Sequence, residues 1–169
     1  MAEPTSYDLF RSVVRNAMHL ELRDSYTPDD PDWIDWRSGR RFDPAERWRG
    51  WFGLMQETTG RGVEVRRARI VSEPISEYVR FEYDVTSGHN IASGESVRWL
   101  PRHRSAGLVV PPVDFWLFDD KAVIWNHFGG DGSWVAEELD TDPESVRLCA
   151  ASFEAVWSRA VPHADYRPR

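Results

Sequence analysis

The sequence predicts an α+β fold, with an antiparallel β-sheet meander, N-terminal helices and a long C-terminal helix. Three observations support this prediction. Apolar residues recur at helical spacing early in the chain, alternating patterns follow over much of 63–139, and a second helical pattern occupies 143–160. Helices followed by a run of strands are typical of α+β domains. Since 169 residues fit one domain, we expect residues 1–169 to form a single globular unit.

Helical patterns account for most of the first sixty residues. Residues 6–19 carry apolar side chains at helical spacing, with Thr5 or Ser6 as a cap, and predict the first helix. Leu20 and Leu22 then alternate with polar neighbours, as in a short strand or a helix exit. Residues 29–37 begin like a short helix.

Asp43 and Pro44 indicate the start of a further helix over 44–58, because Asp is a good cap and Pro suits the first helical position. Gly60 and Gly62 end it. The alternating run 63–71 predicts a strand.

The second half of the chain predicts mainly strands. Residues 72–74 resemble a helix start, for a short helix that continues to about Thr86, and 87–90 form a turn. A strand covers 96–100, a hairpin covers 113–128, and another strand covers 133–139 after a Gly-rich turn. The long helix spans 143–160, and the residues from His163 on are expected to fray.

Composition limits the possible functions. The net charge of -7 argues against a general nucleic-acid binder, which needs a basic surface, although Arg61, Arg66, Arg67 and Arg69 could form a local basic patch. There is no run of 18 apolar residues and no secretory signal pattern, so we expect a cytoplasmic protein without a membrane span. The single cysteine, Cys149, fits a helix core position.

Charged and aromatic residues interleave densely in three blocks, 19–26, 71–83 and 94–101. Buried charges are costly unless they are paired, so these blocks either pair with one another or face a site. The blocks supply our candidate ligand-binding residues, which are Arg23, Asp24, Tyr26, Arg80, Glu82 and Arg98.

Two interpretations of the blocks remain open. If the first block is extended, His19 and Glu21 share a face with Arg23, where a His near a Glu could act as a general acid or base. The plainer alternative is a polar strand face with an internal ion pair of Arg23 or Asp24.

The second block allows the same choice. Glu73, Glu77 and Arg80 at helical spacing would form modestly stabilising pairs. Alternatively, Arg80 and Glu82 line a cavity together with the arginines of the other two blocks, which would bind phosphate or carboxylate.

No motif for a metal or cofactor is present. The five histidines lack ligand spacing, and the Gly-rich segment 128–132 lies between two predicted strands rather than before a helix. Trp99, Trp116 and Trp125 fit core strand positions, with an aromatic stacking platform as the alternative. We therefore expect no cofactor and no metal site.

Five segments of the chain carry a family resemblance: HLELRDSY, RARIVSEPISEYVRFEY, GESVRWLPR, DFWLFDD and FEAVWSRAVPHADY. Over nearly its whole length, the chain resembles the actinobacterial domain-of-unknown-function family 6879. Members of that family are often encoded beside helix-turn-helix regulators. The resemblance implies a part in a regulatory or small partner-protein module and supplies no catalytic residues.

Two functional hypotheses follow. The first is a non-enzymatic partner- or ligand-binding module associated with a helix-turn-helix transcriptional regulator, because an acidic protein can dock on the basic surface of such a partner. The second is a small enzyme or binder that acts on an anionic metabolite through an Arg/Glu-lined cleft. An RNA-cleaving toxin is disfavoured by the negative charge. We expect neither direct nucleic-acid binding nor membrane binding.

Overall fold

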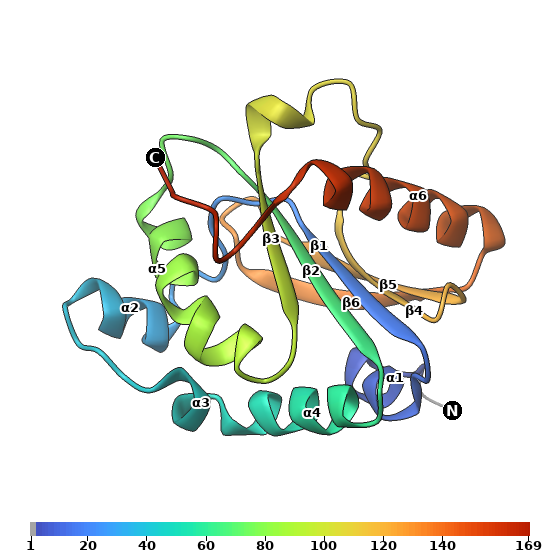
Figure 1. The fold of residues 1–169 in the computed structure, drawn as a ribbon, viewed down its shortest axis with the longest axis horizontal. Coiled ribbons are helices and arrows are strands. Elements are labelled where there is room, and N and C mark those ends of the chain that lie inside the picture. Colours follow the sequence, from blue (N-terminus) through green and yellow to red (C-terminus); the bar gives the residue numbers. More distant parts are fainter. Residues whose placement is uncertain (1–2) are drawn as a thin grey trace.

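The computed structural model describes residues 3–169 as a seven-stranded sheet with helices on both faces (Figure 1). The strand order is β6-β5-β4-β1-β2-β3-β7. The strands are β1 (Asn16–Glu21), β2 (Glu64–Val71), β3 (Ser96–Pro101), β4 (Asp114–Phe118), β5 (Ala122–Phe128), β6 (Trp134–Asp140) and β7 (Val161–Pro162). The expected α+β fold and long C-terminal helix are confirmed.

The antiparallel meander is only partly accurate. Strands β4, β5 and β6 form the expected antiparallel hairpins, but β1, β2 and β3 run parallel at the centre of the sheet. Parallel neighbours need crossover connections. Helices between β1 and β2, and between β2 and β3, supply these crossovers.

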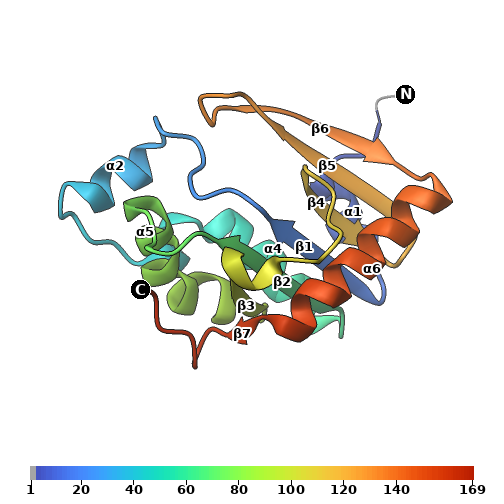
Figure 2. The same cartoon turned by 90° about the horizontal axis from the view of Figure 1, so that it is seen from above.

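Helices cover the two faces of the sheet unequally, as Figure 2 shows. They are α1 (Ser6–Ser12), α2 (Pro31–Arg37), α3 (Pro44–Arg47), α4 (Arg49–Gly60), α5 (Glu77–Thr86) and α6 (Pro143–Arg159), with a π-helix, η1 (Ser87–Ile91), and a 3-10 helix, η2 (Arg102–Ser105). Helix α6 packs on one face. Helices α1 and α4 pack on the other face, where α5 covers β2 and β3. None of the helices in residues 3–169 is both long and apolar enough to cross a membrane.

The alternation of side chains along the central strands decides what each face carries. Met18, Leu20, Ala68 and Ile70 point toward α6 and form an apolar core with its side chains. The intervening positions of β1 and β2 point to the opposite face. There the apolar pattern gives way to charged side chains at the carboxyl ends of these two strands.

The expected helix over 6–19 is wrong in its second half. Helix α1 ends at Ser12 and β1 begins at Asn16. The Asp119 carboxylate accepts backbone N–H bonds from Val14, Arg15 and Asn16 at 3.1, 2.7 and 3.1 Å. These bonds hold the chain in an extended path into the sheet, so a tertiary contact overrides the local helical spacing.

Other boundaries also shift. The helix expected over 44–58 is divided at Trp48 into α3 and α4, and the short helix begins at Glu77 rather than at 72–74. The expected turn at 87–90 lies in η1.

The C-terminal segment is packed rather than frayed. His163 and Tyr166 are buried, and the Tyr166 ring stacks on Trp99 with 5.5 Å between ring centroids. These contacts tie the chain end to the sheet.

Candidate ligand-binding site

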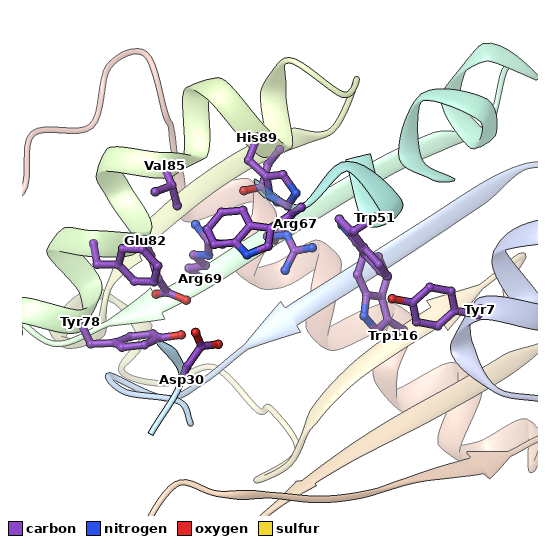
Figure 3. Close-up of a pocket in the computed structure, with 13 residues that line it drawn as sticks. Tyr7, Asp30, Trp51, Arg67, Arg69, Tyr78, Glu82, Val85, His89 and Trp116 are labelled. Carbon is purple, nitrogen blue, oxygen red and sulfur yellow. The ribbon is translucent and has the colours of Figure 1, made fainter. Parts of the chain in front are cut away.

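A cavity of about 430 Å³ lies between the charged face of the sheet and the helices that cover it. Its wall is rich in aromatic side chains, namely Tyr7, Trp48, Trp51, Tyr78, Phe81 and Trp116. Figure 3 shows Glu82 and Tyr78 toward one end, Tyr7, Trp51 and Trp116 toward the other, and Arg67 and Arg69 between them. The size and the mostly apolar lining are typical of small-molecule sites.

Two buried arginines, Arg67 and Arg69, line this cavity and belong to a network of four buried charged residues. The Glu21 carboxylate bonds the guanidinium groups of both Arg67 and Arg69, with 2.5 Å between Arg69 Nε and Glu21 Oε2. Arg67 Nε also donates to Glu95 at 2.8 Å. Two arginines thus face two glutamates, and their charges balance within the fold. Because burial makes an unpaired charge costly, this pairing is what allows the network to exist.

The network is held in place from several directions. Asn90 Nδ2 donates to Glu95 Oε1 at 3.1 Å, and Arg69 Nη1 donates to Thr86 Oγ1 at 2.7 Å. The Arg67 guanidinium lies 5.2 Å from the ring centroid of Trp116. Burial alone would raise the pKa of Glu21, but the charges of Arg69 and Arg67 hold that pKa well below its ordinary value. Glu21 is therefore ionised in the folded protein.

Glu82, on α5, behaves differently. The residue is only 8% exposed, yet its carboxyl group forms no hydrogen bond or ion pair within residues 3–169. Burial raises the pKa of Glu82 to about 8, and the Glu21 and Asp114 carboxylates add to this rise, while Arg69 and Arg67 oppose it. Glu82 is thus largely protonated at neutral pH and faces the cavity without a partner.

A second cavity, of about 270 Å³, shares Tyr78, Glu82 and Trp116 with the first. The Tyr26 hydroxyl donates to Asp114 there, and burial raises the pKa of Asp114 to about 7. Asn126 also lines this cavity, and its buried Nδ2 has no hydrogen-bond partner in the described part of the chain. The shared residues join the two cavities into one region.

His19 lies at the edge of that second cavity. Its Nε2 is 3.2 Å from Glu21 Oε1, its Nδ1 is 2.8 Å from the carbonyl oxygen of Phe115, and its ring stacks on Trp116. Burial lowers the pKa of His19. The expected shared face of His19 and Glu21 is confirmed, with a neutral imidazole between a carboxylate and an indole.

Two of the six candidate residues, Tyr26 and Glu82, lie in this region. The other four do not join them. Arg98 points toward α6, where it lies 4.4 Å from the Trp157 ring centroid, because it has the opposite strand parity to Trp99. Arg80 lies 5.9 Å from the ring centroid of its helix neighbour Tyr83.

Arg23 and Asp24 follow β1 and serve other contacts. Asp24 accepts from the backbone N–H and the hydroxyl of Ser72, which fixes the loop after β2. Arg23 lies over the Phe128 ring, 5.5 Å from its centroid. Arg23, Arg80 and Arg98 therefore lie apart and do not form one cleft.

The arginines at the cavity are Arg67 and Arg69, which sequence reasoning treated only as part of a basic patch. A signal for them existed. They alternate with Ala68 and Ile70 in a strand that is buried on both faces, and charged residues at such positions need buried partners. The partners, Glu21 and Glu95, are distant in sequence, so the pairing itself is visible only in the fold.

No group of three or more His, Cys, Asp or Glu side chains in residues 3–169 is arranged to hold a metal ion.

Comparisons with known proteins identify the family and the fold. Residues 4–168 match the profile of the Domain of unknown function (DUF6879). A comparison with functionally curated proteins finds no match.

Among solved structures, Nuc from Salmonella typhimurium, a phospholipase D family member, is similar with a TM-score of 0.52 and 12% identity, over 95% of this chain and 88% of that one. TrmBL2, an archaeal chromatin protein whose structure shows a novel mode of DNA binding, has a TM-score of 0.51 and 9% identity, over 92% of this chain and 48% of that one. At these identities the likeness concerns the fold alone.

Proposed function

Because the chain belongs to the family named Domain of unknown function (DUF6879), which carries no assigned activity, we propose a function from the site itself: a ligand-binding module that holds a small organic molecule in the aromatic cavity. The observation that carries the proposal is Glu82. Its carboxyl group borders the cavity and has no protein partner, so its hydrogen-bonding capacity is left for whatever occupies that space. Its position at the cavity wall is accounted for if a bound molecule supplies the missing hydrogen bonds.

The aromatic lining supports the same proposal. Large aromatic side chains beside open space leave apolar surface in contact with water, and a ligand would remove that surface. Trp51 lies at van der Waals range of other rings, with its centroid 5.3 Å from Phe10 and 5.6 Å from Tyr7, so it is fixed before a ligand arrives. A site with fixed walls loses little conformational entropy on binding.

The proposal is tested with a fragment library, read by ligand-observed NMR and by thermal unfolding. A ligand at ten times its Kd stabilises the fold by about 1.4 kcal/mol, which raises the Tm of a domain of this size by about 3–5 °C. Val85→Trp places a large side chain in the cavity and should abolish binding of the hits. Asp84→Trp, on the exposed side of the same helix, is the matched control and should bind as the wild type does.

The proposal fails if no fragment binds, or if Val85→Trp binds the hits as strongly as Asp84→Trp does. Circular dichroism and the Tm without ligand check that both variants fold.

A small enzyme is the second candidate function. The observation that favours it is the grouping of Tyr26, Glu82 and Asp114 at one cavity, where two carboxyl groups have pKa values of about 8 and about 7. Groups that titrate near neutral pH suit general acid–base chemistry. Association with a helix-turn-helix regulator stays a prediction, and it requires that such a regulator co-purify with this protein.

A further inference from the structure

The two cavities contain more carboxyl groups than guanidinium groups. Asp30, Glu21, Glu82 and Asp114 line the two cavities, and Glu95 is buried next to Arg67. Two guanidinium groups, those of Arg67 and Arg69, line the first cavity, and they are paired with Glu21 and Glu95. Asp114 is satisfied by the Tyr26 hydroxyl and by the backbone N–H of Leu22, at 3.1 Å for the latter. Glu82 remains as the acid without a counterpart.

The arginines offer little to an incoming anion. All three guanidinium nitrogens of Arg67 donate to Glu21 or Glu95. Arg69 donates through Nε to Glu21 and through Nη1 to Thr86, so only its Nη2 lacks a partner within the described residues. An anionic ligand would also meet the Asp30 carboxylate, which lines the same cavity, and Glu82 once its proton is lost above about pH 8. Like charges at close range in a buried site repel strongly.

A cation would meet the opposite conditions. The carboxyl group of Glu82 is available to it as an acceptor with two oxygen atoms. Aromatic faces attract cations through the ring quadrupole, most strongly for Trp and when the site is desolvated. Trp48, Trp51 and Tyr78 line the cavity together with Glu82.

We propose that the ligand of this cavity carries a cationic nitrogen group, an amine or amidine on an aromatic or apolar frame, and that this group pairs with Glu82. The inference rests on the proposed ligand-binding function and specifies the charge of the ligand. The nitrogen group donates to the carboxylate, and the apolar frame lies against the indole and phenol rings.

Pairing with a cation requires Glu82 to lose its proton, so binding should strengthen with pH. The groups that face Glu82 in the two cavities are His19 and Glu21 on β1, Arg67 and Arg69 on β2, Asp114 on β4, Tyr78 on α5, His89 on η1, Tyr26 in the loop after β1 and Asp30 at the start of α2. Of these, Asp114 also titrates near neutral pH, and its ionisation would favour a cation further. Affinity for a permanently charged cation should rise from pH 6 to pH 8 and then level off.

Three isosteric probes test the charge directly: benzamidine, which is cationic, benzamide, which is neutral, and benzoate, which is anionic. Each is titrated into the protein by ligand-observed NMR and calorimetry at pH 6 and pH 8. At pH 8 we expect benzamidine to bind at least about ten-fold more tightly than benzoate, which is about 1.4 kcal/mol. The preference should shrink at pH 6.

Glu82→Gln keeps the shape of the side chain and removes its charge, so it should abolish the preference for benzamidine. Glu77→Gln is the matched control, because Glu77 lies on the same helix with its side chain 69% exposed, and it should retain the preference. The Tm of each variant verifies its folding.

The inference is overturned if benzoate binds as well as benzamidine, or if Glu82→Gln keeps the cation preference. It is also overturned if the cavity-directed hits of the fragment screen are acids or neutral molecules and no amine or amidine binds, an outcome that leaves the proposed ligand-binding function intact. A screen without any hit overturns both.

Discussion

Arg67 is the residue on which the buried charge network depends. Its guanidinium group donates to Glu21 and Glu95, and all three side chains are buried. An ion pair of this kind gives little net stability, because desolvation opposes the attraction between the charges. Its loss is still costly, since the partners stay buried without compensation.

Arg67→Met should therefore destabilise the fold by about 3–5 kcal/mol, the range for removing one member of a buried pair. Arg98→Met is the matched control on the neighbouring strand. Arg98 is only half-buried; its guanidinium group lies over the Trp157 ring and donates to the Trp157 carbonyl oxygen. We therefore expect Arg98→Met to lower the free energy of unfolding by about 1 kcal/mol. Urea unfolding at pH 7 measures both changes. An equal loss in the two variants would contradict the assigned role of Arg67.

Individual site residues were predictable where the local sequence carried the signal. Tyr26 and Glu82 were singled out by the charged and aromatic residues that crowd around them in the sequence, and both line the second cavity. Arg98 was expected at the same cleft, but its side chain lies on the α6 face of the sheet. Which face it lies on depends on its position in the alternation of side chains along β3. That face follows from the pairing of β3 with β2 and from where α6 packs, neither of which is local in sequence.

At the scale of elements, the turn into β3 fixes the position of Glu95. Gly94 has a φ of +104°, and a Cβ atom added there would lie 2.5 Å from Thr59 Oγ1 and 2.9 Å from Thr59 Cβ. Both the backbone conformation and the close approach of α4 require glycine at this position. The next residue is Glu95, which holds Arg67.

Gly94→Ala should destabilise the protein by about 1–3 kcal/mol, through a strained backbone and displacement of Thr59. Gly53→Ala, in the middle of α4 with open space around its Cα, should instead stabilise by about 0.5–1 kcal/mol. Thermal and urea unfolding of the two variants should therefore move in opposite directions. Gly94→Ala with unchanged stability would show that the turn relaxes freely.

Elements with local patterns were predicted well, and the order of the sheet was not. The hairpin of β4 and β5 and the helix α6 follow from turn residues, caps and periodicity within short windows. The parallel pairing of β1 with β2 joins residues 48 positions apart, such as Asn16 and Glu64. The first part of β1, residues 16–19, has helical spacing in the sequence. The Asp119 carboxylate that holds the chain extended at Arg15 lies about a hundred residues away.

For the whole molecule, the buried titratable groups determine how stability varies with pH. Burial lowers the pKa of His19 and, to about 4, that of His89, so their contribution is present above about pH 6.5 and is lost as pH falls. Glu82 and Asp114 act in the opposite sense, because their pKa values are raised in the fold. Above pH 6.5 each of the two histidines changes stability by only about 0.4 kcal/mol more, so the carboxyl groups dominate up to pH 9.

The wild type should lose stability as pH rises from 6.5 to 9. Over this range the folded protein holds a proton on Glu82 that the unfolded chain has already released, so rising pH favours unfolding until the pKa of about 8 is passed. The interval from pH 6.5 to the pKa of Glu82 is about 1.5 pH units. At about 1.4 kcal/mol per unit, the titration of Glu82 lowers the free energy of unfolding by about 2 kcal/mol. Glu82→Gln cannot titrate and should keep about that much more of its pH 6.5 stability at pH 9. Urea unfolding across this range measures the difference, with Glu77→Gln as the exposed control. If stability falls equally with pH in the wild type and in Glu82→Gln, then Glu82 is already ionised at pH 6.5 and its surroundings stabilise the carboxylate.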